Sequence, residues 1–239
     1  MSLLPLNKIT YAVSNVDDGN MSLKFGTDTE VARNRKNFLN NIGIPSNACA
    51  GINLVHGSEI IPVSKSDVSE CAFKAKNGDA LTTSEKDIFL FMMTSDCLPV
   101  TLFDPATSQL ALVHCGWKST EEKIVQKVIS YFINKGSKAA NILAIMGPCI
   151  HKKSYRFVDP IQKKLPGWET FLRDVEGGET EIDLLGYNIH QLLQSGIINK
   201  NIETSPFDTA AEKKYFSHYR SVKTGEKEGR FCTVVGMKN

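Results

Sequence analysis

Short apolar segments, each bounded by Gly, Asp or Pro, recur along this chain and constrain its fold more than any other feature. Runs of this length and composition are typical of buried strands. We expect strands over residues 50–55, 59–63, 88–94, 109–114 and 142–146, and an alternating pattern predicts one more over 230–237. A fold built around buried sheets is therefore expected.

Three stretches show helical periodicity, over residues 29–42, 120–135 and 184–195. The strongest is 120–135, because its apolar residues fall on one face and Ser119 with Glu122 forms a capping-box pattern at its start. We expect these helices to pack their apolar faces on the sheets.

The order of the elements indicates the fold class. Helices and strands are mixed without the strict alternation of a doubly wound sheet, which favours an α+β fold or a layered α/β sandwich with mixed sheets. No internal repeat and no Pro- or Ser-rich linker divides the sequence. We therefore expect a single domain over residues 1–239.

The charge balance argues against two classes of partner. Lys and Arg total 28 against 26 Asp and Glu, and no block of like charges suggests a nucleic-acid arm or a membrane anchor. The longest apolar run, 88–93, is far shorter than the ~20 residues that span a bilayer, and the first residues lack the pattern of a signal peptide. We expect a cytoplasmic enzyme or binding protein for small molecules, without nucleic-acid or membrane partners. The sequence carries no signal for an oligomeric state.

Three metal-binding side chains stand where predicted strands end: His56, Cys97 and His114. Two imidazoles and a thiolate suit Zn²⁺ and leave a fourth position open for water or substrate, as a catalytic site requires. The separations are 41 residues from His56 to Cys97 and 17 from Cys97 to His114, so no short ligand motif is present. A structural role explains the same positions: the two histidines would only form hydrogen bonds at strand ends, and Cys97 would be a buried thiol. Cys115 is expected to face away from the site, since successive strand side chains point to opposite faces.

Phosphate is a second candidate ligand, because Lys118 and Ser119 stand at the start of the strongest predicted helix. Free backbone N–H groups at a helix N-terminus favour an anion, and Lys118 adds a full charge. A plain helix cap with a solvated lysine explains the same residues. Arg35 and Arg220 could add positive charge to a phosphate-binding cleft.

Two aspartates are candidates for proton transfer or for orienting a metal ligand. Asp96 directly precedes Cys97, and Asp79 lies in a Gly-Asp-Ala sequence. Turn formation is the simpler explanation for Asp79, so Asp96 is the predicted proton-transfer residue.

Five segments in order carry a resemblance to a known family: LVHG at 54–57, GDALTT at 78–83, TSDCLPV at 94–100, VHCGWK at 113–118 and MGPCI at 146–150. Together they resemble the YfiH-like laccase-domain family of purine nucleoside phosphorylases, once called polyphenol oxidases. Further matches at 34–35 and 216–220 extend the resemblance over nearly the whole chain.

The resemblance implies a layered α/β/β/α domain that holds Zn²⁺ at the positions matching His56, Cys97 and His114. It also implies phosphorolysis of adenosine, inosine, guanosine and methylthioadenosine, with adenosine deamination as a second activity. Purine nucleosides and phosphate are then the expected ligands. On this hypothesis the catalytic residues are Asp96, Cys97 and Lys118, and the phosphate or substrate contacts are Arg35, Lys118, Ser119 and Arg220.

The chain departs from the family pattern at several positions. Lys118 stands where the family has an arginine that can grip two phosphate oxygens, and Ser119 replaces a glycine. Arg156 replaces a glutamate, Tyr219 replaces an arginine, and Leu54 replaces a glutamine. These changes indicate a divergent member with altered substrate preference.

Three alternative functions use the same residues. A multicopper oxidase site requires many imidazole ligands, whereas this chain has five histidines and no His-x-His pair. Copper is therefore the less favoured metal. A cysteine hydrolase would use Cys97 as nucleophile with His114 or His56 as its base. A non-catalytic protein would bind metal or nucleoside without turnover.

Overall fold

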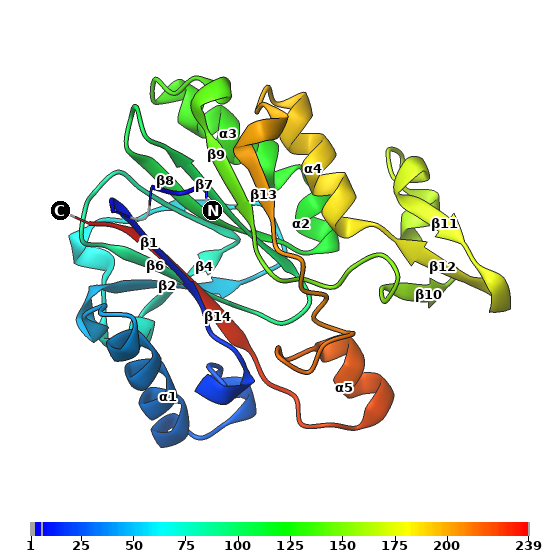
Figure 1. Ribbon diagram of the computed structural model, residues 1–239, viewed down its shortest axis with the longest axis horizontal. Helices are drawn as coiled ribbons and strands as arrows, with labels where there is room; N and C mark the ends of the chain where they lie inside the picture. The colour runs from blue at the N-terminus through cyan, green and yellow to red at the C-terminus, as the bar shows by residue number, and fades with distance from the viewer. Residues whose placement is uncertain (1–2, 6, 239) are drawn as a thin grey trace.

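The computed structural model describes residues 3–5 and 7–238, in which two mixed sheets lie face to face (Figure 1). The first sheet has the spatial order β1 (Ile9–Val13), β14 (Phe231–Met237), β6 (Phe89–Thr94), β2 (Cys49–Leu54) and β4 (Ala75–Gly78). The second has the order β13 (Ile202–Thr204), β9 (Leu143–Met146), β7 (Leu98–Asp104), β8 (Gln109–Cys115), β5 (Ala80–Thr83) and β3 (Ile60–Pro62).

Helices cover the outer faces of the two sheets (Figure 1). One core cluster joins α1 (Asp28–Asn41) to the five-stranded sheet, and another joins α3 (Ile124–Asn134) and α4 (Leu184–Gln194) to the six-stranded sheet. A third cluster lies between the sheets. The layers therefore follow the order α/β/β/α, which confirms the predicted fold class.

The central strand β8 is apolar on both faces, because each face packs on a core cluster. Leu110 and Leu112 belong to the cluster between the sheets, whereas Ala111, Val113 and Cys115 belong to the cluster under the helices. Successive side chains of a strand point to opposite faces, so a strand covered on both sides needs apolar residues at every position. Cys115 therefore faces the helix side, and it is not a member of the group formed by His56, Cys97 and His114.

A small three-stranded sheet stands apart from the two large ones, at one side of the molecule (Figure 1). Its order is β10 (Arg156–Val158), β12 (Glu179–Ile182) and β11 (Leu172–Asp174). A last helix, α5 (His218–Thr224), precedes β14. No helix in the described part of the chain is long and apolar enough to cross a membrane.

Most predicted elements are present with shifted ends, but the predicted helix over 120–135 is wrong as a single element. It is divided into α2 (Trp117–Glu121) and α3 at Lys123, whose φ of 60° is left-handed. The Lys123 ammonium donates to the Tyr187 hydroxyl on α4. Ser119 lies inside α2 rather than at its cap, so the predicted Ser119–Glu122 capping box is not formed.

Candidate active site

Three connections cross from the five-stranded to the six-stranded sheet, and they carry most of the site. The chain passes from β2 to β3 through His56, from β4 to β5 through Asp79, and from β6 to β7 through Cys97. His114 lies on β8, and its backbone N–H donates to the Asp79 carbonyl at 2.8 Å. The topology therefore brings residues far apart in the sequence to one end of the sandwich.

His56, Cys97 and His114 meet there as the sequence predicts. Their nearest ligand atoms all lie within 4.8 Å of one another. The two imidazole rings are perpendicular, with centroids 4.9 Å apart. Two ring nitrogens and one sulfur at this spacing are suited to a single metal ion.

Asp79 orients both histidines. Its side chain is fully buried, and Oδ1 lies 2.8 Å from Nδ1 of His114. The same carboxylate accepts the backbone N–H groups of His56 at 2.9 Å and Gly57 at 2.7 Å. A carboxylate at Nδ1 leaves Nε2 of His114 as the ring atom available to a metal. Turn formation, the simpler explanation of Asp79 from the sequence, is therefore incomplete, because the Asp79 carboxylate also fixes the His114 ring.

The local charges favour a thiolate at Cys97. Burial opposes ionisation of this thiol, but the charge and hydrogen bonds of His114, together with those of His56, lower its pKa to about 6. Burial also opposes a charged His114, yet the Cys97 charge and the Asp79 hydrogen bond raise the pKa of His114 to about 9. The pKa of Asp79 lies below its usual value, because the His114 and Gly57 hydrogen bonds outweigh its burial. A thiolate is the form of cysteine that binds metals.

Gly116 keeps space open beside the three candidate ligands. A Cβ at this position would lie 3.3 Å from the Cys97 sulfur, 3.3 Å from Cε1 of His114 and 3.4 Å from Cδ2 of His56. Such contacts are tighter than most Cβ contacts. The donor set, the buried carboxylate behind it and this space together fit a metal ion.

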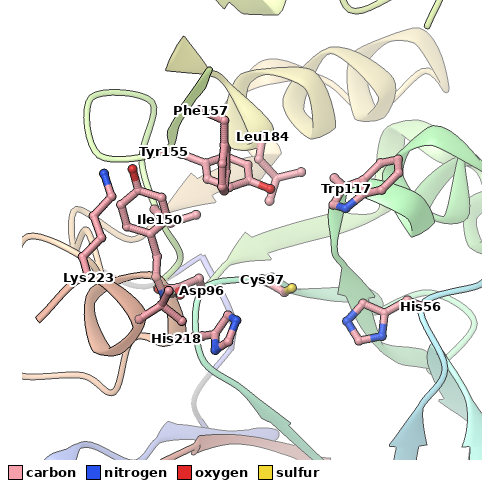
Figure 2. Close-up of a pocket in the computed structure, with 12 residues that line it drawn as sticks. His56, Asp96, Cys97, Trp117, Ile150, Tyr155, Phe157, Leu184, His218 and Lys223 are labelled. Carbon is pink, nitrogen blue, oxygen red and sulfur yellow. Dashed lines mark hydrogen bonds between the residues drawn. The ribbon is translucent and has the colours of Figure 1, made fainter. Parts of the chain in front are cut away.

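A cavity of about 340 Å³ opens over Cys97 and His56. Figure 2 shows Tyr155, Phe157 and Leu184 on the side of this pocket opposite His56 and Cys97, with Trp117 beside them. The remaining lining residues are Asp96, Ile150, His218, Tyr219, Val222 and Lys223. The volume is in the range of small-molecule sites.

Aromatic rings form one wall of the pocket. The centroids of Tyr155 and Phe157 are 5.4 Å apart, and those of Phe157 and Tyr219 are 5.6 Å apart, each pair edge to face. The Tyr219 hydroxyl donates to the Arg156 carbonyl at 2.8 Å, which fixes its ring. The sequence reasoning missed this wall, because Tyr155 directly precedes β10, Phe157 lies on β10 and Tyr219 lies on α5, and the three share no local motif.

Comparison with known proteins identifies the family. The model of the multi-copper polyphenol oxidoreductase laccase family matches residues 10–238. The chain belongs to this family. The resemblance found in the sequence is thereby confirmed.

Curated relatives of this laccase-family chain are named purine nucleoside phosphorylase. YlmD of Bacillus subtilis is 26% identical over 220 residues, which cover 88% of this chain and 78% of the relative. YlmD of Geobacillus stearothermophilus is 28% identical over 231 residues, which cover 92% of this chain and 83% of the relative.

Solved structures agree with the fold. A Bacillus licheniformis hypothetical protein, YfiH, superposes with a TM-score of 0.87 at 26% identity, covering 96% of this chain and 93% of its own. The Geobacillus stearothermophilus YlmD structure superposes with a TM-score of 0.84 at 28% identity. The match covers 92% of this chain and 85% of the YlmD chain.

In this laccase-family chain Arg35 does not line the pocket over Cys97 but a separate hollow beside Phe73 and Phe91, so its prediction as a phosphate contact of the candidate site is wrong. Only 3% of its surface is exposed, and it donates to the carbonyls of Met21 at 2.8 Å and Cys71 at 2.9 Å. Its guanidinium lies over the rings of Phe73 and Phe91. The arginine therefore joins α1 to the five-stranded sheet.

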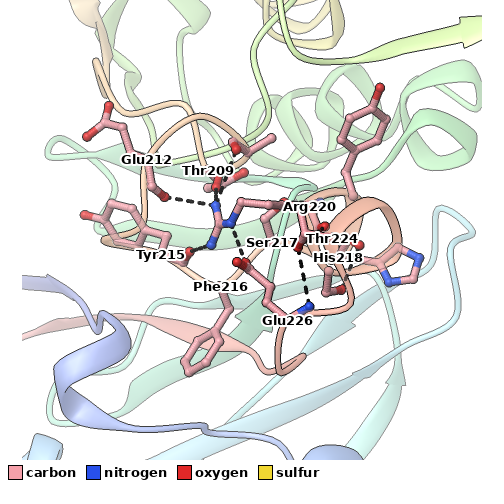
Figure 3. Close-up of polar contacts among 12 residues, drawn as sticks. Thr209, Glu212, Tyr215, Phe216, Ser217, His218, Arg220, Thr224 and Glu226 are labelled. Carbon is pink, nitrogen blue, oxygen red and sulfur yellow. Dashed lines mark hydrogen bonds and ion pairs between the residues drawn. The ribbon is translucent and has the colours of Figure 1, made fainter.

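Arg220 is also used inside the protein, so its prediction as a phosphate contact is wrong. Figure 3 shows its guanidinium donating to the Thr209, Glu212 and Tyr215 carbonyls and pairing with the Glu226 carboxylate. These bonds tie the loop before α5 to the helix. They leave little of the guanidinium for an anion.

Lys118 and Ser119, the two residues predicted at the helix start, differ in their exposure to solvent. Ser119 is fully buried and does not line the pocket, so it is no phosphate contact; its hydroxyl has no partner among the described residues. Lys118 is exposed, and its ammonium lies 5.6 Å from the centre of the Trp117 ring, next to the pocket. A role for Lys118 in catalysis or phosphate binding stays a prediction.

Asp96 lines the pocket, but both of its carboxylate oxygens are engaged. Oδ1 accepts the Thr209 hydroxyl at 2.7 Å, and Oδ2 accepts the backbone N–H of Tyr219 at 2.7 Å. Asp96 therefore holds the start of α5 in place. Its predicted role in proton transfer stays a prediction.

Proposed function

We propose that this chain is a zinc-dependent purine nucleoside phosphorylase acting on adenosine, inosine, guanosine and methylthioadenosine, with adenosine deamination as a second activity. The observation that carries the proposal is the meeting of His56, Cys97 and His114 on one side of an aromatic pocket of about 340 Å³. The names of the curated relatives support the same reaction class.

Zn²⁺ fits the candidate ligands better than copper. A bound zinc ion supplies Lewis-acid chemistry and leaves one coordination position for water or substrate. A multi-copper site needs further groups of ligands, and in residues 3–5 and 7–238 the set His56, Cys97 and His114 is the one group of three or more such side chains. We therefore propose one zinc ion despite the copper in the family's name.

The pocket has the shape and surface that a nucleoside requires. A purine ring is flat and apolar on its faces, so the rings of Tyr155, Phe157 and Tyr219 can pack against it. Trp117 and Leu184 add further apolar surface on which a nucleoside can pack. The polar residues stand at the metal end and at α5, where reacting groups are needed.

A cysteine hydrolase remains the second candidate, because Cys97 and His114 also have the spacing of a nucleophile and its base. Alkylation separates the two functions. A nucleophile reacts stoichiometrically with iodoacetamide in metal-free buffer and supports turnover there, whereas a metal ligand is shielded by bound zinc and supports turnover only with it.

The proposal is tested by incubating the purified protein with adenosine or inosine, with and without phosphate. Free base and ribose 1-phosphate should form only with phosphate, and inosine should form from adenosine without it. Chromatography detects these products. Absence of product above a Cys97→Ala control would remove the enzyme function and leave a binding protein.

A further inference from the structure

The pocket contains a histidine outside the candidate metal ligands: His218, the first residue of α5. In the view of Figure 2 its imidazole lies on the same side of the pocket as Cys97, and Cys97 lies between His218 and His56. A substrate that fills the cavity over Cys97 therefore meets His56 on one side and His218 on the other.

Two acceptors fix the position of His218. Its Nδ1 lies 2.8 Å from Oε1 of Glu228, and its backbone N–H donates to the Ser95 hydroxyl at 2.8 Å. Arg230 donates to the same Glu228 oxygen at 2.9 Å. Because the carboxylate engages Nδ1, Nε2 is the ring atom left for a ligand.

Glu228 is ionised in this arrangement. Its partial burial opposes the charge, but the hydrogen bonds from Arg230 and His218 outweigh burial and hold its pKa below the usual value. A carboxylate that engages Nδ1 fixes the orientation of the imidazole, as a general acid requires. The pair thus has the parts of an oriented proton donor.

Other ionisable groups at this end of the pocket are engaged. Asp96 accepts a hydrogen bond at each oxygen, and the Tyr219 hydroxyl donates to a backbone carbonyl. The Lys223 ammonium lies 4.4 Å from the centre of the Tyr219 ring. Burial raises the pKa of Tyr155, so this hydroxyl keeps its proton. Among the described residues that line the pocket, His218 offers the most available proton-transfer atom outside the metal ligands.

We propose that His218 is a further catalytic residue, which donates a proton from Nε2 to the departing purine, and that Glu228 is its positioning residue. This inference rests on the proposed phosphorylase function. It assigns to His218 the proton transfer that the sequence pattern assigned to Asp96.

The proton transfer balances over one turnover. The bond between C1′ and the purine N9 breaks with its electron pair on the purine, while an oxygen of hydrogen phosphate bonds to C1′. The purine takes a proton from Nε2 of His218. Formation of the ester releases the phosphate proton, which restores His218. The products are the neutral base and ribose 1-phosphate.

A nucleoside that needs no leaving-group proton provides the test. The purine of 7-methylinosine already carries a positive charge, so it departs without protonation. The variants are His218→Gln and Glu228→Gln. The matched control is His190→Gln, since His190 is an exposed histidine of α4 that does not line the pocket.

With inosine, His218→Gln should lower kcat about 100-fold, as expected for loss of a general acid, and leave KM within about twofold. With 7-methylinosine the same variant should lose no more than about fivefold. Glu228→Gln should show a smaller loss with the same substrate dependence, and His190→Gln should match the wild type. The His218 side chain is 59% exposed, so the variant should fold, and circular dichroism with zinc content verifies this.

Three outcomes have distinct meanings. An unchanged kcat of His218→Gln with inosine overturns the inference. Equal losses of the variant with both nucleosides also overturn it, because they indicate a structural effect. Absence of wild-type turnover with either nucleoside contradicts the proposed function itself, and the inference falls with it.

Discussion

Nδ1 of His114 lies 2.8 Å from Oδ1 of Asp79, and both residues are almost fully buried. The same carboxylate accepts the backbone N–H groups of His56 and Gly57. One side chain therefore joins the two histidines that would hold the metal. The geometry of the ligands depends on Asp79 although it is not a member of the candidate ligand group.

Replacing Asp79 should weaken metal binding without removing a ligand. Asp79→Asn loses the charge beside His114 and one of its acceptor oxygens, so we expect zinc affinity to fall about 10–100-fold. Competition with a chromophoric chelator measures this. An unchanged affinity would show that Asp79 has no part in orienting the ligands.

Gly116→Ala should obstruct the site sterically. The added methyl group would lie 3.3 Å from the Cys97 sulfur and from His114 Cε1. Since Gly116 has a φ of −77°, the backbone accepts alanine without strain, and unfolding by urea should match the wild type. We expect weaker zinc binding and reduced turnover. Wild-type zinc affinity in this variant would contradict the tight fit.

The convergence of the three candidate metal ligands was predictable, whereas the positions of the predicted phosphate contacts were not. His56, Cys97 and His114 were recognisable because each stands at the end of an apolar strand. Arg35 and Arg220 looked like free cations in the sequence, but their guanidinium groups donate to backbone carbonyls that only the folded chain brings near. Such contacts leave no local signal.

Arg220→Met should therefore act on stability rather than on phosphate binding. It leaves several loop carbonyls without their donor, so the free energy of unfolding should fall by about 2–4 kcal/mol. Urea denaturation measures this fall, with the exposed Lys227→Met as control. The KM for phosphate should stay within about twofold. A large increase in that KM with unchanged stability would restore Arg220 as a phosphate contact.

Two errors in the predicted elements have identifiable causes, one local and one tertiary. Strand β7 was missed because Pro99, a residue without an N–H donor, stands near its start. In the structure Pro99 is the second residue of β7, and its carbonyl accepts the Gly147 N–H. The helix over 120–135 is divided because Lys123 adopts a left-handed conformation and bonds to Tyr187, a tertiary contact that periodicity does not report.

Alkylation of the metal-free protein should depend on pH in a defined way. The pKa of Cys97 is lowered to about 6, so its thiolate forms as pH rises through 6 rather than near the ordinary value of 9.0. Iodoacetamide reacts with the thiolate. The other five cysteines are buried, so mass spectrometry should find modification at Cys97 first. A rate that rises only near pH 9 would contradict the charge arrangement, and added zinc should suppress the reaction.

Zinc stoichiometry tests the central claim most directly. The wild type, Cys97→Ala and His114→Ala are stripped with a chelator, dialysed against buffered zinc and measured by elemental analysis. The account predicts one zinc ion per wild-type chain and background levels in both folded variants. Background zinc in the wild type, or an equal load in all three proteins, would contradict it.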